Sequence, residues 1–115
     1  MTVQDDTSLE RALAPVRARF IGALEDHILS FEALRQQAAG ATDAQPSLDQ
    51  IGKLAHRIAG IAGSVGFDNI GERAGRVERS VIACRDPGLS DADRQARVSA
   101  ELEPLLDVLE AHLDD

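Results

Sequence analysis

The residue of this chain best suited to chemistry is His56. An imidazole is mostly neutral at pH 7, so one of its ring nitrogens is a free nucleophile without help from a base. Three glycines stand at helical spacing around it: Gly52 and Gly60 one turn to either side, and Gly63 two turns further on. This combination indicates a reactive side chain that the active site of a partner can approach closely.

The glycines matter because of where they lie on the predicted helix. At 100° per residue, His56 falls about 150° from the centre of the apolar positions, so it should face solvent. Each internal glycine costs about 0.8–1 kcal/mol relative to alanine. Two or three of them cost about 2–3 kcal/mol of the 5–15 kcal/mol that typically stabilises a domain. We interpret Gly52, Gly60 and Gly63 as a cleared surface that lets a partner approach His56. The apolar positions are Leu48, Ile51, Ala55, Ile58 and Ala62.

Four segments with apolar residues at three- and four-residue spacing predict four helices. They run from Pro15 to Gly40, from Ser47 to Gly66, from Asp68 to about residue 85, and from Ser90 to Leu113. Pro15 suits an opening helical turn, whereas Pro104 predicts a kink or break in the last helix. We therefore expect an all-α, up-down antiparallel four-helix bundle, with room for a short extra N-terminal helix over residues 7–13.

Composition bounds the function of this chain. Its 115 residues make one domain, 1–115, with an aromatic content of 3% that favours helices packed on helices. The net charge of −8 argues against binding to nucleic acid, and one cysteine cannot form an internal disulfide. The polar, acidic start is unlike a signal peptide, and no apolar run reaches membrane-spanning length. We expect a cytoplasmic monomer.

Charge is unevenly distributed along the chain. Residues 47–85 hold six basic and four acidic side chains. This mildly basic middle favours an anion near His56.

The segment Ala55–Phe67 resembles the histidine-containing phosphotransfer (HPt) domain family. His56 is followed two residues on by Ile58, four on by Gly60 and ten on by Gly66, with the small residues Ala62, Gly63 and Ser64 between them. The resemblance extends over nearly everything after residue 15. It implies a phospho-acceptor histidine on an exposed helix face, in a phosphoryl carrier that is not an autonomous kinase.

The same resemblance implies how the chain works and with whom. His56 would carry a phosphoryl group between aspartates of receiver domains in a two-component phosphorelay, with response regulators and a hybrid histidine kinase as partners. The chain would need no cofactor, because the Mg²⁺ ion belongs to the partner receiver domain. No metal site of its own is predicted. The residues that would surround the phosphoryl group are Gly52, Lys53, Arg57, Gly60, Gly63 and Ser64.

One position departs from the family pattern. Many members carry a lysine three residues after the histidine, where this chain has Ala59. Lys53 and Arg57 are the candidate substitutes. The departure also leaves an alternative open, a degenerate HPt adaptor that binds a receiver-like or other signalling protein without being phosphorylated. A purely structural dimerising bundle is a further alternative, and it predicts no special need for Gly52 or Gly60.

Overall fold

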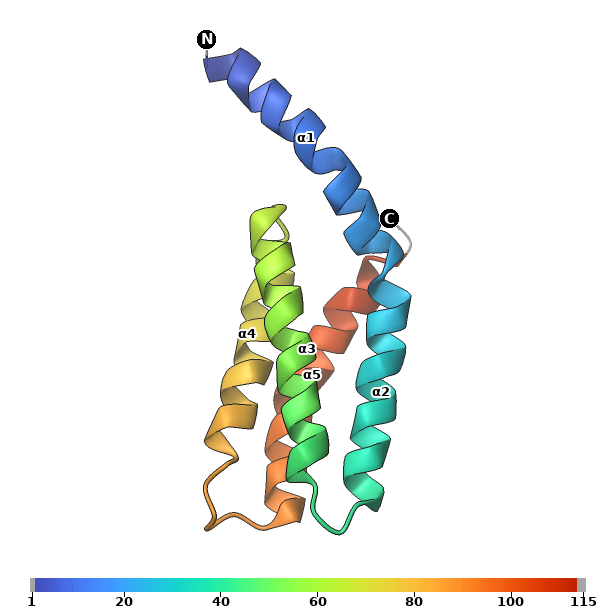
Figure 1. Cartoon of the computed structure of the whole chain (residues 1–115), viewed down its shortest axis with the longest axis vertical. Coiled ribbons are helices and arrows are strands. Elements are labelled where there is room, and N and C mark those ends of the chain that lie inside the picture. Colours follow the sequence, from blue (N-terminus) through green and yellow to red (C-terminus); the bar gives the residue numbers. More distant parts are fainter. Residues whose placement is uncertain (1, 114–115) are drawn as a thin grey trace.

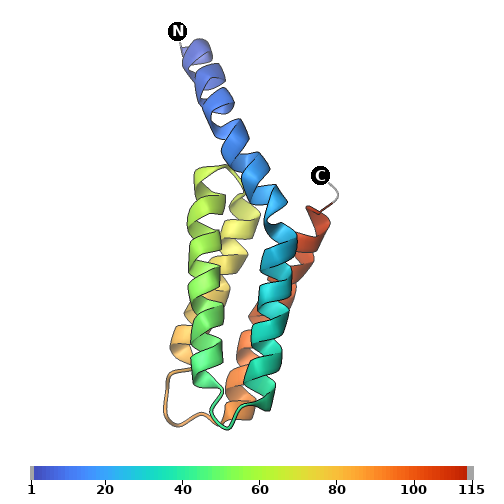
Figure 2. The same cartoon turned by 45° about the vertical axis from the view of Figure 1, so that its right-hand side comes forward.

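The computed structural model describes residues 2–113, and the side chains of residues 8–113, as five helices and their connections (Figure 1). The helices are α1 (Thr2–Gly22), α2 (Leu24–Gly40), α3 (Gln45–Ser64), α4 (Asp68–Ala83) and α5 (Asp91–Ala111). Helices α2 to α5 run alternately up and down as a bundle, and α1 rises from its upper end (Figures 1 and 2). The described residues contain no strand. The predicted all-α bundle is confirmed.

The core is formed by the apolar faces of these four helices. α3 packs most extensively on α4, α4 packs on α5, and α2 bridges α3 and α5. Burying the apolar face of α3 on three neighbours fixes its rotation, so that the opposite face is turned to solvent. The largest fully buried side chains include Leu24, Phe31, Leu48, Ile51, Ile58, Ile70, Leu102, Leu105 and Leu109.

The N-terminal helix differs from the expectation. It is a long helix rather than a short one, Pro15 lies inside it, and the chain turns at Ala23 instead. A proline removes one backbone donor, and the Ala- and Leu-rich sequence around it keeps the remaining turns helical. At the break, the N–H of Ala23 donates to the carbonyls of Arg19 and Phe20, at 3.1 Å each.

The change of direction at Ala23 closes the upper end of the bundle. The ring of Phe20 stacks on that of Phe67 with centroids 5.4 Å apart, and His112 packs edge-on against Phe67. Arg17 Nε donates to the carbonyl oxygen of Val65 at 2.7 Å. The C-terminal half of α1 is therefore docked on the bundle through the loop between α3 and α4.

The ends of α3 are set by proline and glycine. The helix begins at Gln45, two residues before the expected Ser47, because Pro46 fits the first turn of a helix, where its missing N–H costs nothing. Gly66, with φ of +89°, takes the left-handed conformation that reverses the chain after α3.

The last helix begins as predicted and does not break. Ser90 caps it by accepting a hydrogen bond from the N–H of Asp93 at 3.1 Å. α5 then continues through Pro104, because buried leucines on both sides of the proline hold the helix against the core. None of the described helices is both long enough and apolar enough to cross a membrane.

Candidate functional site

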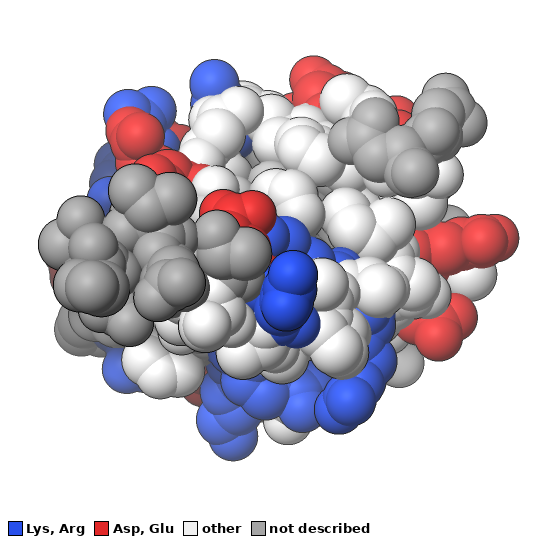
Figure 3. All heavy atoms as spheres, turned by 90° about the horizontal axis from the view of Figure 1, so that it is seen from above, with Lys and Arg blue, Asp and Glu red and all other residues white. Residues whose placement is uncertain are grey.

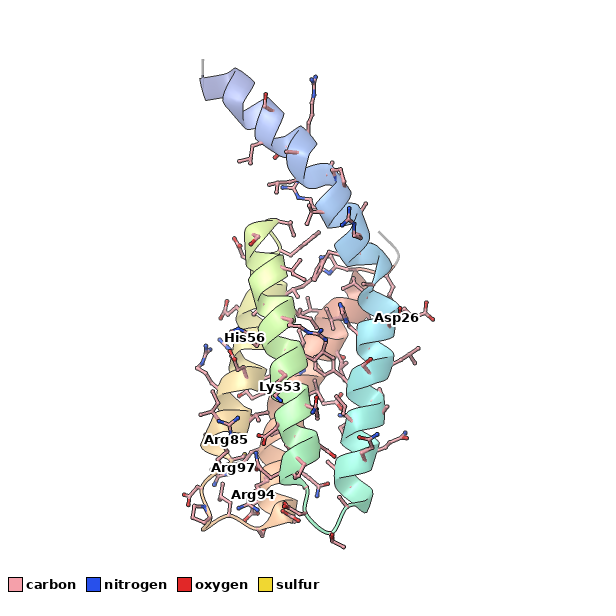
Figure 4. The ribbon with its side chains drawn as sticks, viewed as in Figure 1. Asp26, Lys53, His56, Arg85, Arg94 and Arg97 are labelled. Atoms are coloured by element: carbon pink, nitrogen blue, oxygen red, sulfur yellow. The ribbon has the colours of Figure 1, made fainter. Side chains whose placement is uncertain are left out.

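His56 lies on the outer face of α3, as the helical wheel predicted. Its side chain is 71% exposed, whereas Ala55 and Ile58 on the inner face are buried. Figure 4 shows His56 on the side of α3 that faces α4. The imidazole is therefore held by the fold at a surface that a second protein can reach.

One ring nitrogen of His56 is engaged by a residue of the next helix. Nδ1 lies 2.7 Å from Oε2 of Glu78, which projects from α4 and is 32% exposed. A carboxylate can only accept a hydrogen bond, so the proton of the neutral imidazole is on Nδ1. This tautomer leaves Nε2 with a free lone pair. Glu78 thus orients the ring and leaves Nε2 as the unengaged nitrogen.

A second polar pair joins the two helices below His56. Nε of Arg85 lies 3.3 Å from Oδ1 of Asp49, and each member of this pair is seven residues, about two helical turns, from its counterpart in the His56–Glu78 pair. Between the pairs lies a groove of about 350 Å³, with Val81 and Ile82 among the residues that line it. His56 therefore stands at one end of a groove whose walls are polar and whose floor is apolar.

The structure corrects the interpretation of Gly52. This residue lines the groove but is buried, and a Cβ placed on it would lie 3.1 Å from Cγ1 of Val81. Glycine at this position lets α3 and α4 approach closely, and that approach brings Glu78 within reach of His56. The helical wheel placed Gly52 on the free side of α3 because it took no account of how far α4 wraps around that side.

Gly60 and Gly63 are exposed, with open space where a side chain would stand. They continue the free face of α3 above His56 but do not line the groove. The hydroxyl of Ser64 donates to the carbonyl of Gly60 at 2.9 Å, so it is engaged within its own helix. The roles predicted for these residues around a phosphoryl group remain predictions.

Two cations stand beside the histidine. Lys53 and Arg57 are exposed, both line the groove with His56, and neither forms an ion pair with any residue that the structure describes. Figure 3 shows Lys and Arg side chains gathered at its lower edge, the side that faces the viewer in Figure 1, where α3 lies in front. Ala59 is half-buried, and its carbonyl lies close to Gly71 of α4. Lys53 and Arg57 therefore place two positive charges in the groove that His56 lines.

The same two cations also line a second groove, of about 450 Å³, between α3 and α2, together with His27. His27 is half-buried, as expected for a core-edge side chain. Burial, with a smaller contribution from the charge of Arg57, lowers the pKa of His27 below its ordinary value. His27 therefore stays neutral and adds no charge to this side of α3.

Glu78 is the member of the site that the sequence interpretation missed. It flanks the apolar positions Val77 and Val81 of α4, where an acidic residue ordinarily marks the edge of a buried face. One signal was available: His56 stands eleven residues before Phe67 and Glu78 eleven after it. Residues equally far from a tight turn between antiparallel helices lie at the same height. Within the described residues, no group of His, Cys, Asp and Glu side chains could hold a metal ion.

Comparison with known proteins places this chain in a family. Residues 15–115 match the family described as Hpt domain, so the match covers all of α2 to α5 and the docked half of α1. No curated protein and no solved structure matches the chain.

Proposed function

Because the chain belongs to the Hpt domain family, whose members are phosphoryl carriers of phosphorelays rather than kinases, we propose that it carries the phosphoryl group on His56. The observation that supports this assignment is the pair His56–Glu78, in which an exposed imidazole has one nitrogen held by a carboxylate and the other free.

The transfer step follows from this geometry. The lone pair of Nε2 attacks the phosphorus of an aspartyl phosphate on a receiver domain, forming the N–P bond. The P–O bond to the aspartate breaks, and its electron pair leaves with the carboxylate. The imidazole, still protonated on Nδ1, becomes cationic as the bond forms, and the negative Glu78 stabilises that charge. The reverse step delivers the phosphoryl group to an aspartate of a second receiver domain.

The phosphoryl group on Nε2 needs cations nearby. Lys53 precedes His56 by three residues, so the two side chains are neighbours on the helix surface. Arg57 adds a planar donor on the α2 side. We assign to these two residues the part that the lysine at the position of Ala59 plays in other members. Mg²⁺ and most of the transition-state stabilisation come from the receiver domain.

The partners that fit this chemistry are receiver domains of response regulators and of a hybrid histidine kinase. The mildly basic face around His56 complements the acidic site that holds a receiver's phospho-aspartate, which favours encounter between proteins of opposite local charge. We expect the exchange to take place in the cytoplasm.

Label transfer tests the proposal directly. When the chain is mixed with a panel of receiver domains phosphorylated on aspartate, at least one should pass its label to the chain within minutes. The linkage should be labile to acid and stable to base, because it is a phosphoramidate. If every receiver binds or ignores the chain without passing label, the protein is the adaptor and not the carrier.

The glycines of α3 should respond differently to substitution. Gly60→Gln should keep or raise the melting temperature, since Gly60 faces open space and glycine is the poorer helix former by up to about 1 kcal/mol. It should slow transfer at least about tenfold by displacing the approaching aspartate. Gly52→Leu should instead lower the free energy of unfolding by at least about 2 kcal/mol, because it collides with Val81. A Gly60→Gln variant that unfolds while each folded molecule transfers normally would refute the cleared-surface interpretation.

A further inference from the structure

The first helix carries an apolar stripe that the bundle covers only at its lower end. Leu9, Leu13, Val16 and Phe20 are spaced by four, three and four residues, the spacing of a seam between two helices. Phe20 is buried in the bundle and Leu13 is half-buried, but Leu9 is 59% and Val16 39% exposed. Figures 1 and 2 show the first half of α1 standing clear of the other helices, and residues 2–14 lie outside the family match.

An apolar hollow lies at the foot of this stripe. It has a volume of about 370 Å³ and is lined by Val16, Phe20, Ala23 and Ile61, with Arg19 and His27 at its polar margin. Ile61, on α3, is exposed. The stripe therefore leads into a hollow of a size that accepts a leucine side chain, and the free end of the same stripe carries one, Leu9.

The charged residues beside the stripe would face residues of opposite charge on a second copy of α1. Glu10 and Arg17 lie two turns apart along one flank. Within one chain, Nη1 of Arg17 lies 3.8 Å from Oε2 of Glu10, while Nε of Arg17 donates to the carbonyl of Val65. In an antiparallel pair of α1 helices with Leu13 facing Val16, Leu9 faces Phe20. Glu10 of each copy then lies beside Arg17 of the other. This ion pair forms twice because the arrangement has two-fold symmetry.

We propose that α1 is a homodimerisation helix, paired antiparallel with α1 of a second copy, with Leu9 of each copy seated in the hollow of the other. The self-complementary charges favour a second copy over an unrelated partner, which would need to supply an opposite pattern. This proposal differs from the monomer expected from the sequence. His56 remains open in the dimer, since Ile61 is about 140° around α3 from it. The inference does not depend on phosphotransfer.

The proposal is tested by sedimentation equilibrium over a concentration series. The wild-type chain should pass reversibly from its mass of 12.3 kDa toward twice that value. The double variant Leu9→Glu/Val16→Glu should stay at the mass of one chain with unchanged helical content, because both side chains are exposed. The matched control is Leu29→Glu on α2, which is as exposed as Leu9 and should dimerise like the wild type.

Charge reversal tests the register. Glu10→Arg alone and Arg17→Glu alone should each associate at least tenfold more weakly than the wild type, because each places like charges opposite one another. Mixed in equal amounts, the two variants should recover association as a heterodimer, in which both pairs are again opposite in sign. A wild-type chain that is monomeric throughout, or a mixture that stays as weak as its components, would overturn the proposal. A third result would also overturn the proposal: the wild-type chain is monomeric, and the Leu9→Glu/Val16→Glu variant no longer binds a receiver domain. The apolar stripe would then be a contact surface for the receiver domain.

Discussion

The His56→Gln variant is expected to accept no phosphoryl group from any receiver domain that labels the wild-type chain. Glutamine has no nucleophilic nitrogen, so the N–P bond cannot form. The fold should be unaffected, because the replaced side chain is 71% exposed and contributes little packing. Label incorporation, followed together with the thermal midpoint, separates loss of the nucleophile from loss of structure.

The other two histidines supply the controls for this experiment. His27 is half-buried at the α2–α3 groove, and His112 packs on Phe67 at the end of the bundle, so neither is presented as His56 is. His27→Gln and His112→Gln should both retain labelling. Full labelling of His56→Gln would assign the acceptor to another residue and remove the site described above.

Removal of the Glu78 carboxylate should have the second largest effect on transfer. In Glu78→Ala the imidazole loses the acceptor that holds its Nδ1 proton, so the ring rotates freely and the proton redistributes between the two nitrogens. Loss of such an orienting partner typically costs about 10–100-fold in activity. We expect that reduction in the rate of transfer from phosphorylated receiver domains, with the thermal midpoint close to that of the wild type.

If Glu78 only stabilised the fold, its removal would not change the tautomer of His56. A spectroscopic measurement on the imidazole therefore distinguishes a structural role of Glu78 from an orienting role. The ¹⁵N shifts of His56 should report the Nδ1-protonated tautomer in the wild type and a mixture in Glu78→Ala. Glu78→Gln should keep the tautomer, because its amide oxygen still accepts a hydrogen bond, but transfer more slowly than the wild type because the negative charge is gone. Glu72→Ala, on the same helix and paired with Arg76, is the matched control and should change neither quantity. A Glu78→Ala variant that transfers at the wild-type rate contradicts the assignment.

The periodicity of the sequence was sufficient to predict helices α3, α4 and α5 and the exposed face of α3. Apolar residues at helical spacing specify which side of each helix is buried, because burial of that side stabilises the fold whatever the neighbours are. The exposed position of His56, the reversal of the chain at Gly66 after α3 and the cap at Ser90 all follow from local chemistry of this kind. The family resemblance rested on the same residues, and the family match over residues 15–115 confirms it.

Only the tertiary structure decided the distance between neighbouring helices and which residues of two helices lie side by side along the bundle axis. A helical wheel places Gly52 among the exposed residues, but the contact with Val81 makes it a point of close packing between α3 and α4. Several acidic residues follow His56 in the chain, and the height at which α4 packs on α3 brings Glu78 to it. The direction of α1 was likewise open, because the break at Ala23 rather than at Pro15 depends on the packing of Phe20 against Phe67. Local sequence fixes the rotation of each helix about its own axis, whereas distance and height depend on side chains from two helices fitting together.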